Sequence, residues 1–308
     1  MAVGGGIITT GSHPKALWPG IDAFWGQMYD EHPREYPDLF DEKNSGMAFE
    51  QQVQVTGFGL ANVKPEGASG TFDSEIQGTV STYTHIAYFL GYIVTYEELK
   101  DNLYEKVSRE RAEANAFSMV QTVENVCAGI YNDAFLGQVF LNANGQTLCA
   151  TSNPNTTGGT FSNALTPSAD LMEASLEDIC IQAMGLQTDR NLFVAILPQS
   201  LHVPRQQWFN ANRILKSVLQ SGTANNDINV LKAVNAFPKG IKLNHYFTSP
   251  NAWFVRTNCR HGMQMFWRDH PEFDQDNDYD TKNAKAGTYM RFSAGDTDPR
   301  CILGSNGP

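Results

Sequence analysis

The sequence contains an acidic run at residues 274–280, in which aspartates occupy every second position and could together bind a cation. Carboxylates at this spacing resemble the beginning of a calcium-binding loop. Such a loop needs glycine at its sixth place and glutamate at its twelfth. Those places hold Tyr279 and Lys285, so an EF-hand is excluded.

The same run is better explained as part of an extended strand. There its aspartates would share one face and repel one another unless they are solvated or paired with basic groups. Three interpretations remain: a solvated acidic face, a contact of Asp276 and Asp278 with basic residues of another subunit, or a bound cation.

Motifs of known catalytic sites are absent. The sequence contains no Gly-x-Ser-x-Gly nucleophile elbow, no Gly-x-x-x-x-Gly-Lys-Ser/Thr phosphate loop and no His-Glu-x-x-His pair. His261 and His270, the closest two histidines, bracket an expected strand, and we assign them a structural role. The sequence therefore predicts no catalytic, cofactor-binding or metal-binding residue, and favours a protein that is not an enzyme.

The composition is that of an acidic globular protein. The chain has 308 residues, 41% apolar and 18% charged, with a net charge of −11 and a pI near 5.0. Phosphate contacts require clustered basic residues, which are missing here, so a general nucleic-acid-binding protein is excluded. Neither a membrane-spanning helix nor a signal peptide is predicted. The five cysteines, an odd number without Cys-x-x-Cys spacing, indicate buried free thiols in a reducing compartment.

Residues 1–46 are predicted to form an extended, irregular N-terminal arm. Prolines recur at positions 14, 19, 33 and 37, a density that we take to exclude a long helix. Bulky aromatic residues stand between them, Trp18 and Trp25 included, whereas disordered tails are poor in aromatics. We expect the arm to dock through these anchors, either on its own chain or on a neighbouring one.

Residues 47–94 are predicted to form a long β-hairpin. Residues 49–56 alternate apolar and polar side chains, and residues 80–94 are rich in β-branched and aromatic ones. The glycine-rich connection 57–78 is long enough to be functional or mobile. It carries Lys64, which is either a solvated lysine or one half of a salt bridge to another subunit.

Residues 95–137 are predicted to form one helix of about 41 residues, roughly 60 Å long. Thr95 and Glu98 form a capping box at its start, and Gly137 stands where a C-terminal stop is expected. Its second half is largely apolar. The helix either covers its own domain or forms the spine of a subunit built for assembly. Its charged first half supplies further candidate intersubunit contacts: Glu105, Arg109 and Arg111.

The remaining residues predict a mixed α/β domain followed by a sheet. The expected elements are helices over 166–185 and 204–219, and strands at 192–197, 241–247, 252–255, 263–267, 289–292 and 301–303. We expect the last three strands to form a sheet that packs back against the long helix.

Several segments together carry a resemblance to a known family: Leu90–Leu99 leading into the long helix, Asn132–Phe135, Asn144–Leu148, Leu197-Pro198 and Arg291–Ser305. With the order of arm, hairpin, long helix, α/β domain and returning sheet, they resemble the major capsid proteins of tailed phages, whose fold is named after phage Hong Kong 97. The resemblance is closest to the Mu-like head subunits and covers nearly the whole chain from about residue 45.

The resemblance implies an α+β capsid fold with five parts: an N-terminal arm (1–46), an E-loop hairpin (47–94), a P-domain spine helix (95–140), an A-domain (141–250) and a P-domain return sheet with tail (251–308). It implies self-assembly into hexamers and pentamers of an icosahedral head, which encloses double-stranded DNA and contacts it non-specifically. The implied virion forms in the host cytoplasm, with scaffolding, portal and decoration proteins as partners and without cofactor or membrane.

Two features depart from relatives, and two other hypotheses compete. No helical N-terminal scaffolding segment is expected, and no partner is identifiable for a lysine–asparagine cross-link through Lys64. An encapsulin-like shell of the same fold, holding enzyme cargo, is the alternative to a phage head. An enzyme of unknown chemistry on an α/β scaffold is the third hypothesis. Arms and loops favour a shell, because they supply heterologous contacts without a large flat apolar patch.

Overall fold

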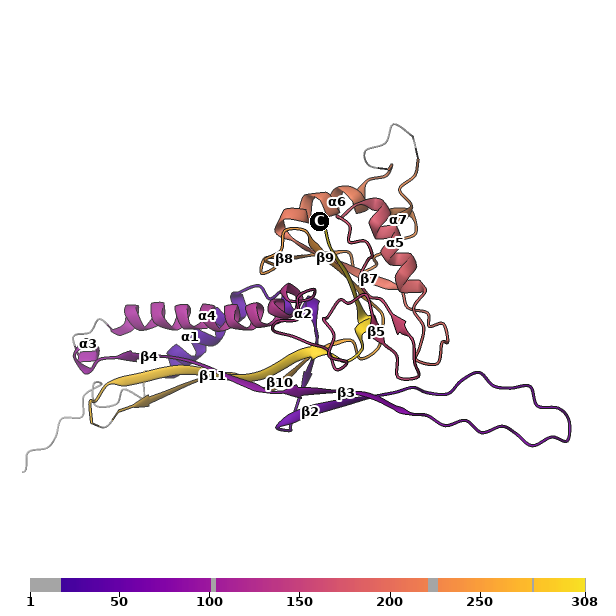
Figure 1. Ribbon diagram of the computed structural model, residues 1–308. Coiled ribbons are helices and arrows are strands. Elements are labelled where there is room, and N and C mark those ends of the chain that lie inside the picture. Colours follow the sequence, from indigo (N-terminus) through magenta and orange to yellow (C-terminus); the bar gives the residue numbers. More distant parts are fainter. Residues whose placement is uncertain (1–17, 101–103, 221–226, 279, 308) are drawn as a thin grey trace, which may run out of the picture.

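The computed structural model describes residues 18–100, 104–220, 227–278 and 280–307. Figure 1 shows an elongated molecule: a flat sheet with helices along it forms a base, an α/β unit stands above one end, and a two-stranded hairpin projects beyond it. The architecture is α+β, as predicted, and is organised by two four-stranded sheets. None of the helices in these ranges is long and apolar enough to cross a membrane.

The base sheet has the strand order β1-β10-β11-β4. Its strands are β1 (Asp41–Asn44), β4 (Ile86–Val94), β10 (Met263–Asn277) and β11 (Ala284–Asp296). β1 runs parallel to β10, and the other pairs are antiparallel. Alternate residues of β11, from Ala284 to Phe292, are buried in the core shared with the long helix α4. Two of the three strands predicted for the return sheet, 263–267 and 289–292, are confirmed as parts of the longer strands β10 and β11, whereas the third, 301–303, does not join this sheet.

The long helix is shorter than predicted. α3 (Tyr96–Lys100) and α4 (Tyr104–Asn132) are separate helices. The Arg111 guanidinium pairs with the Glu98 carboxylate at 2.9 Å. In one straight helix these residues would lie about 20 Å apart along the axis, beyond the reach of their side chains, so α3 is not the first part of a continuous rod. The Thr95 hydroxyl accepts from the Glu98 N–H at 3.4 Å, as predicted, but the Glu98 carboxylate binds Arg111 rather than completing the capping box.

α4 ends at Asn132, about one turn before the predicted stop. The carboxylate of the next residue, Asp133, accepts hydrogen bonds from three backbone N–H groups at 2.7–2.9 Å, those of Gln138, Val139 and Phe140. Gly137 has a φ of +66°, the left-handed conformation that its predicted role as a stop requires. The chain therefore turns away from α4 around a single side chain.

The N-terminal segment contains two helices, which corrects the prediction of an irregular arm. They are α1 (Trp18–Glu31) and α2 (Tyr36–Leu39). Pro19 stands in the first turn of α1, where proline has no hydrogen bond to lose, and Pro33 follows its end. The spacing of the prolines thus delimits a helix and does not prevent one.

α1 docks on its own chain through Trp25, which is 4% exposed. The indole N–H donates to Asn115 Oδ1 on α4 at 3.0 Å, and the ring stacks on Tyr29 and on Phe273 of β10. α1 is therefore fixed between the long helix and the base sheet (Figure 1). This placement leaves Trp25 no surface for a neighbouring subunit.

The predicted hairpin forms over its first part. β2 (Phe49–Val55) and β3 (Gln77–Thr84) pair antiparallel. The second predicted strand is divided at His85, because β4 beyond it belongs to the base sheet. The buried His85 ring lies within hydrogen-bond distance of Ser45 Oγ (3.1 Å) and Ser293 Oγ (2.9 Å), and these contacts hold the crossover on the base sheet.

The α/β unit is built on the sheet β12-β9-β7-β8. Its elements are β7 (Pro198–Pro204), β8 (Ile241–Asn244), β9 (Ala252–Thr257), β12 (Ile302–Asn306), α5 (Glu173–Met184), η3 (Arg205–Gln207), α6 (Trp208–Lys216), α7 (Val230–Ala233) and the small pair β5 (Asn153–Pro154) and β6 (Thr160–Phe161). They enclose a second hydrophobic core around Leu176, Leu201 and Trp253.

Three predictions in this unit are wrong. α5 begins at Glu173 and not at Thr166-Pro167. The apolar run 192–197 forms one isolated bridge but no strand, because a tight turn at 188–192 leads into the run. Phe193 in this run is 76% exposed, and the buried strand begins only after the run, as β7. β9 and β12 join this sheet and not the base sheet, so the unit draws on residues beyond 250.

Two carboxyl groups are buried in this framework. Glu124 on α4 is 0% exposed; its Oε1 accepts from the N–H groups of Glu35 and Tyr36 at 2.7 and 3.2 Å, while Oε2 has no hydrogen-bond partner. Burial raises the pKa of Glu124 to about 7. Asp296, at the end of β11, also has one oxygen without a partner, and burial raises its pKa to about 7. Both groups gain protons on folding near neutral pH.

We expect the free energy of unfolding to fall as the pH rises from 6 to 8.5. A carboxyl whose pKa is raised in the folded chain contributes stability that is present at low pH and lost as the pH passes the folded value, here about 7. Glu124→Gln removes this carboxyl and should therefore raise the unfolding free energy by about 1–2 kcal/mol more at pH 8.5 than at pH 6. Denaturant titrations at both pH values check this, and a wild-type stability that increases towards pH 8.5 would contradict it.

Candidate functional site

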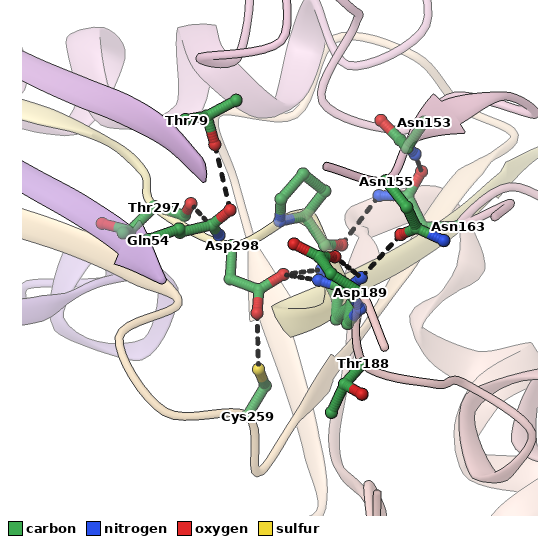
Figure 2. A network of polar contacts seen from close by, with 12 residues as sticks. Gln54, Thr79, Asn153, Asn155, Asn163, Thr188, Asp189, Cys259, Thr297 and Asp298 are labelled. Carbon is green, nitrogen blue, oxygen red and sulfur yellow. Dashed lines mark hydrogen bonds and ion pairs between the residues drawn. The ribbon is translucent and has the colours of Figure 1, made fainter. Parts of the chain in front are cut away.

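The projecting hairpin is fastened to the body at Thr297, directly after β11. The Gln54 amide of β2 donates to the Thr297 carbonyl oxygen at 2.7 Å, and the Tyr83 hydroxyl of β3 lies 2.6 Å from the Thr297 hydroxyl. Thr79 donates to Gln54 Oε1 at 3.0 Å (Figure 2). Both hairpin strands therefore converge on one residue, which is itself buried.

Three residues further along, Arg300 in the short helix η4 (Pro299–Cys301) joins the base to the α/β unit. Its side chain is 8% exposed. The guanidinium binds four polar groups and stacks on one ring: the carboxylates of Asp189 (2.7 Å) and Asp298 (3.2 Å), Asn155 Oδ1 (2.9 Å), the Gln187 carbonyl oxygen (2.8 Å) and the Phe161 ring (4.3 Å). A buried cation needs such compensation, because desolvation is costly for an unpaired charge.

Asn163 and Asn153 continue this polar network beside Arg300 (Figure 2). The buried Asn163 amide donates to the carbonyl oxygens of Pro299 (2.9 Å) and Ile302 (3.1 Å), and its Oδ1 accepts from Asn153 at 2.9 Å. These bonds hold η4 against the segment that follows β6 and, through Asn153, against β5. The segment 297–302 is thus held by the hairpin at Thr297 and by Asn163 at Pro299 and Ile302.

A cleft of about 640 Å³ lies beside this junction, between residues 52–56 of the hairpin, 194–196, 258–261 and 297–300. The Cys259 thiol lies 3.5 Å from Asp298 Oδ2. Burial and this carboxylate raise the pKa of the thiol, which stays protonated at neutral pH and is therefore a poor nucleophile. The other four cysteines are buried free thiols, as predicted. The cleft is suited to holding parts of the subunit together rather than to covalent chemistry.

Among the candidate intersubunit contacts, several side chains are engaged within their own chain. Trp25 is in the core, and Arg111 pairs with Glu98. The Arg109 guanidinium lies 5.9 Å from the centroid of the Phe24 ring on α1. Asp278 pairs with Lys285 at 2.9 Å. These contacts stabilise the subunit itself.

The structure does not bring the remaining candidates together. Lys64 is exposed on the hairpin loop, and Asp276 is exposed on β10, opposite Lys285 in register. Glu105 lies on α4 and Trp18 at the start of α1, but their side chains fall outside the described residues. The candidates thus belong to four separate elements, and the two whose side chains are described, Lys64 and Asp276, form no common site.

Sequence reasoning missed the apolar side chains of the hairpin loop. Phe72 is 100% exposed, Val63 94%, Leu60 82% and Phe58 61%. The available signal was the presence of large apolar residues in a glycine-rich connection, where water would surround them. Exposed apolar side chains that recur along one projecting segment mark a surface for another molecule.

Comparisons with known proteins agree with this geometry. A model of the family described as phage capsid protein matches residues 80–304. No curated protein matches the sequence at a significant level. Solved structures share the fold, among them the virus-like particle from Pyrococcus furiosus (10% identity, TM-score 0.52, covering 94% of this chain and 99% of that one). A structure from Mycobacterium phage Patience (9%, 0.52, 98% and 89%) and the capsid of Myoviridae phage XM1 (12%, 0.50, 88% and 90%) also match.

Arg300→Ala should destabilise the subunit by about 3–5 kcal/mol, because it leaves the Asp189 and Asp298 carboxylates buried without their cation. Arg300→Lys should cost less, since it retains the charge but loses the planar fork. Arg205→Ala, at an exposed arginine of η3, is the matched control and should change stability by under about 0.5 kcal/mol. Denaturant unfolding of the variants measures these differences, and equal stabilities of the Arg300→Ala and control variants would contradict the role given to Arg300.

Proposed function

Because the chain belongs to the phage capsid protein family, we propose that its copies assemble into hexamers and pentamers of an icosahedral shell that encloses double-stranded DNA. As a major capsid protein it is located in the virion. Assembly takes place in the host cytoplasm, with scaffolding, portal and decoration proteins as further partners. The shell contacts the packaged DNA non-specifically, and the chain performs no catalysis. The Mu-like head subunits are the proposed branch, on the strength of the segment Leu90–Leu99 and the long helix after it.

The observation that carries the assembly proposal is the projecting hairpin with its apolar loop. The loop extends past the body (Figure 1), and four of its large apolar residues, Phe58, Leu60, Val63 and Phe72, are 61–100% exposed. Exposing such side chains to water is unfavourable in an isolated subunit, and contact with a second copy would bury them. A heterologous contact of this kind generates a ring or shell when its rotation closes.

The structural units support a division into the domains of a capsid subunit. The hairpin β2–β3 corresponds to the E-loop, but β4 belongs with α4 and the base sheet in the P-domain. The α/β unit corresponds to the A-domain and includes β9 and β12 as well as residues 141–250. The net charge of −11 suits a shell from which DNA must be released, because few phosphate contacts form.

We expect the expressed chain to form capsomers or shells of megadalton size. Size-exclusion chromatography with electron microscopy checks this, and a compact monomer at every concentration would contradict the proposed function. The contents of purified particles separate the two kinds of shell: packaged DNA in particles from infected cells supports a phage head, whereas an enzyme cargo supports an encapsulin-like compartment.

The hairpin loop should be needed for closure but not for folding. Replacing Phe58, Leu60, Val63 and Phe72 with serine preserves the length of the loop and removes its apolar surface. The variant should unfold at the wild-type denaturant midpoint but yield no closed particles. A second variant, in which Asn-Gly replaces residues 56–76 between the paired Val55 and Gln77, should behave in the same way. Normal particles from either variant would show that the loop is not an assembly contact.

A further inference from the structure

The hairpin is held at a second place, just beyond its paired strands and three residues before β3 begins. The Arg190 guanidinium donates to the Ser74 carbonyl oxygen and lies 3.9 Å from the Asp73 carboxylate, on the arm of the hairpin loop that leads into β3. Arg190 belongs to the α/β unit, 116 positions away from Ser74. Its side chain is 22% exposed and its Nε is buried without a hydrogen-bond partner, so the guanidinium is held by the hairpin on one side and enclosed by protein on the other.

The turn that presents Arg190 is rigidly built. The Thr188 N–H donates to the Leu192 carbonyl oxygen at 2.8 Å, and the Thr188 hydroxyl accepts from the N–H groups of Arg190 and Leu192 at 3.3 and 3.2 Å. Asn191 adopts a φ of +57°, which closes the turn. The turn therefore presents its side chains in fixed directions.

Neighbouring side chains of this turn point to different parts of the molecule. The Asp189 carboxylate binds Arg300 at 2.7 Å in the junction, whereas Arg190 reaches outwards to the hairpin. The Thr157 hydroxyl donates to the Asp189 carbonyl oxygen and holds the turn against the β5–β6 pair. A side chain on Gly78 of β3 would come within 2.9 Å of Thr156 Oγ1, so the hairpin passes close to this pair as well. One turn thus connects the junction, the α/β unit and the hairpin.

On the hairpin, the Asp73 carboxylate pairs with Arg190 and also links the two arms of the loop. Its Oδ2 accepts from the Gly59 N–H at 2.8 Å, across the loop. The backbone hydrogen bonds from Gly59 and Ser74 lower the pKa of Asp73, with a smaller contribution from Arg190, so the carboxylate is charged at neutral pH. Arg190 therefore acts on both arms of the loop through one carboxylate.

We propose that Arg190 is a positioning residue that fixes the direction in which the hairpin leaves the subunit, and through it the geometry with which a second copy of this chain is engaged. The root at Thr297 attaches the hairpin at one residue and fixes where it starts. A second attachment beyond the root also fixes its direction. The part of the inference that concerns assembly rests on the proposed shell function, and the part that concerns the direction of the hairpin does not.

Hydrogen exchange tests the tie itself. In Arg190→Ala, the backbone amides of Thr56, Gly59 and Ile76 on the hairpin should exchange about tenfold faster than in the wild type, as expected for the loss of one charge-assisted hydrogen bond. The amides of α4 should be unaffected. Arg205→Ala, which removes an exposed arginine from the same unit, is the matched control and should leave hairpin exchange unchanged. Equal exchange in the two variants would overturn the inference.

A charge exchange distinguishes a specific tie from general damage to the turn. Arg190→Glu alone places a second carboxylate beside Asp73 and should accelerate hairpin exchange more than Arg190→Ala does. Combining Arg190→Glu with Asp73→Arg restores opposite charges and should reverse the part of this effect that comes from repulsion, while the hydrogen bonds to the Ser74 carbonyl oxygen and from the Gly59 N–H stay lost. A double variant that exchanges as fast as the worse of its two single variants would contradict a direct tie.

Particle size tests the consequence for assembly. Particles of Arg190→Ala should show a broader or shifted distribution of diameters by electron microscopy, whereas the control variant Arg205→Ala should keep the wild-type diameters. Unchanged diameters, together with faster exchange, would overturn the role in assembly and leave the tie in place. Absence of particles from the wild-type chain would instead refute the proposed shell function, while the exchange experiment would still decide whether the tie exists.

Discussion

The buried guanidinium of Arg300 is the interaction on which the arrangement of this capsid subunit depends. Its charge is balanced by carboxylates from two places, Asp189 in the α/β unit and Asp298 in the segment that leaves the base sheet. Because a desolvated charge is costly without its counterions, the unit cannot turn on the base without exposing or unpairing this group. Thr297, three residues earlier, carries both strands of the hairpin. The positions of two large parts of the molecule are therefore set by residues 297–300.

Local patterns in the sequence predicted the elements whose neighbours are close in the chain. The alternation in residues 49–56 gave one hairpin strand, and the apolar second half of residues 95–137 gave the helix under the return sheet. The break between α3 and α4 was missed because neither proline nor glycine marks it; the ion pair of Glu98 with Arg111 reveals it. α1 was missed for the opposite reason, since prolines at both of its ends were interpreted as breakers of a helix that they delimit.

The contacts made by residues 297–300 could not be predicted from the sequence, because the residues that form them are far apart in the chain. Arg300 and Asp189 are 111 positions apart, and Tyr83 and Thr297 are 214 apart. No spacing rule connects an arginine in a short helical turn with an aspartate in a distant loop. The charged residues that did stand out, such as Arg111 and Asp278, proved to be paired within the subunit. Residue type showed that these groups need partners, but it carried no information on which chain would provide them.

The late position of the junction in the chain has a consequence for translation. During synthesis, the hairpin and the α/β unit leave the ribosome long before residues 297–306 do. Until then Asp189 has no guanidinium to bind, Gln54 and Tyr83 have no Thr297, and the second sheet lacks its edge strand β12. The nascent subunit therefore lacks the root of the hairpin and the last strand of its second sheet, so its final arrangement forms only after residues 297–306 have left the ribosome.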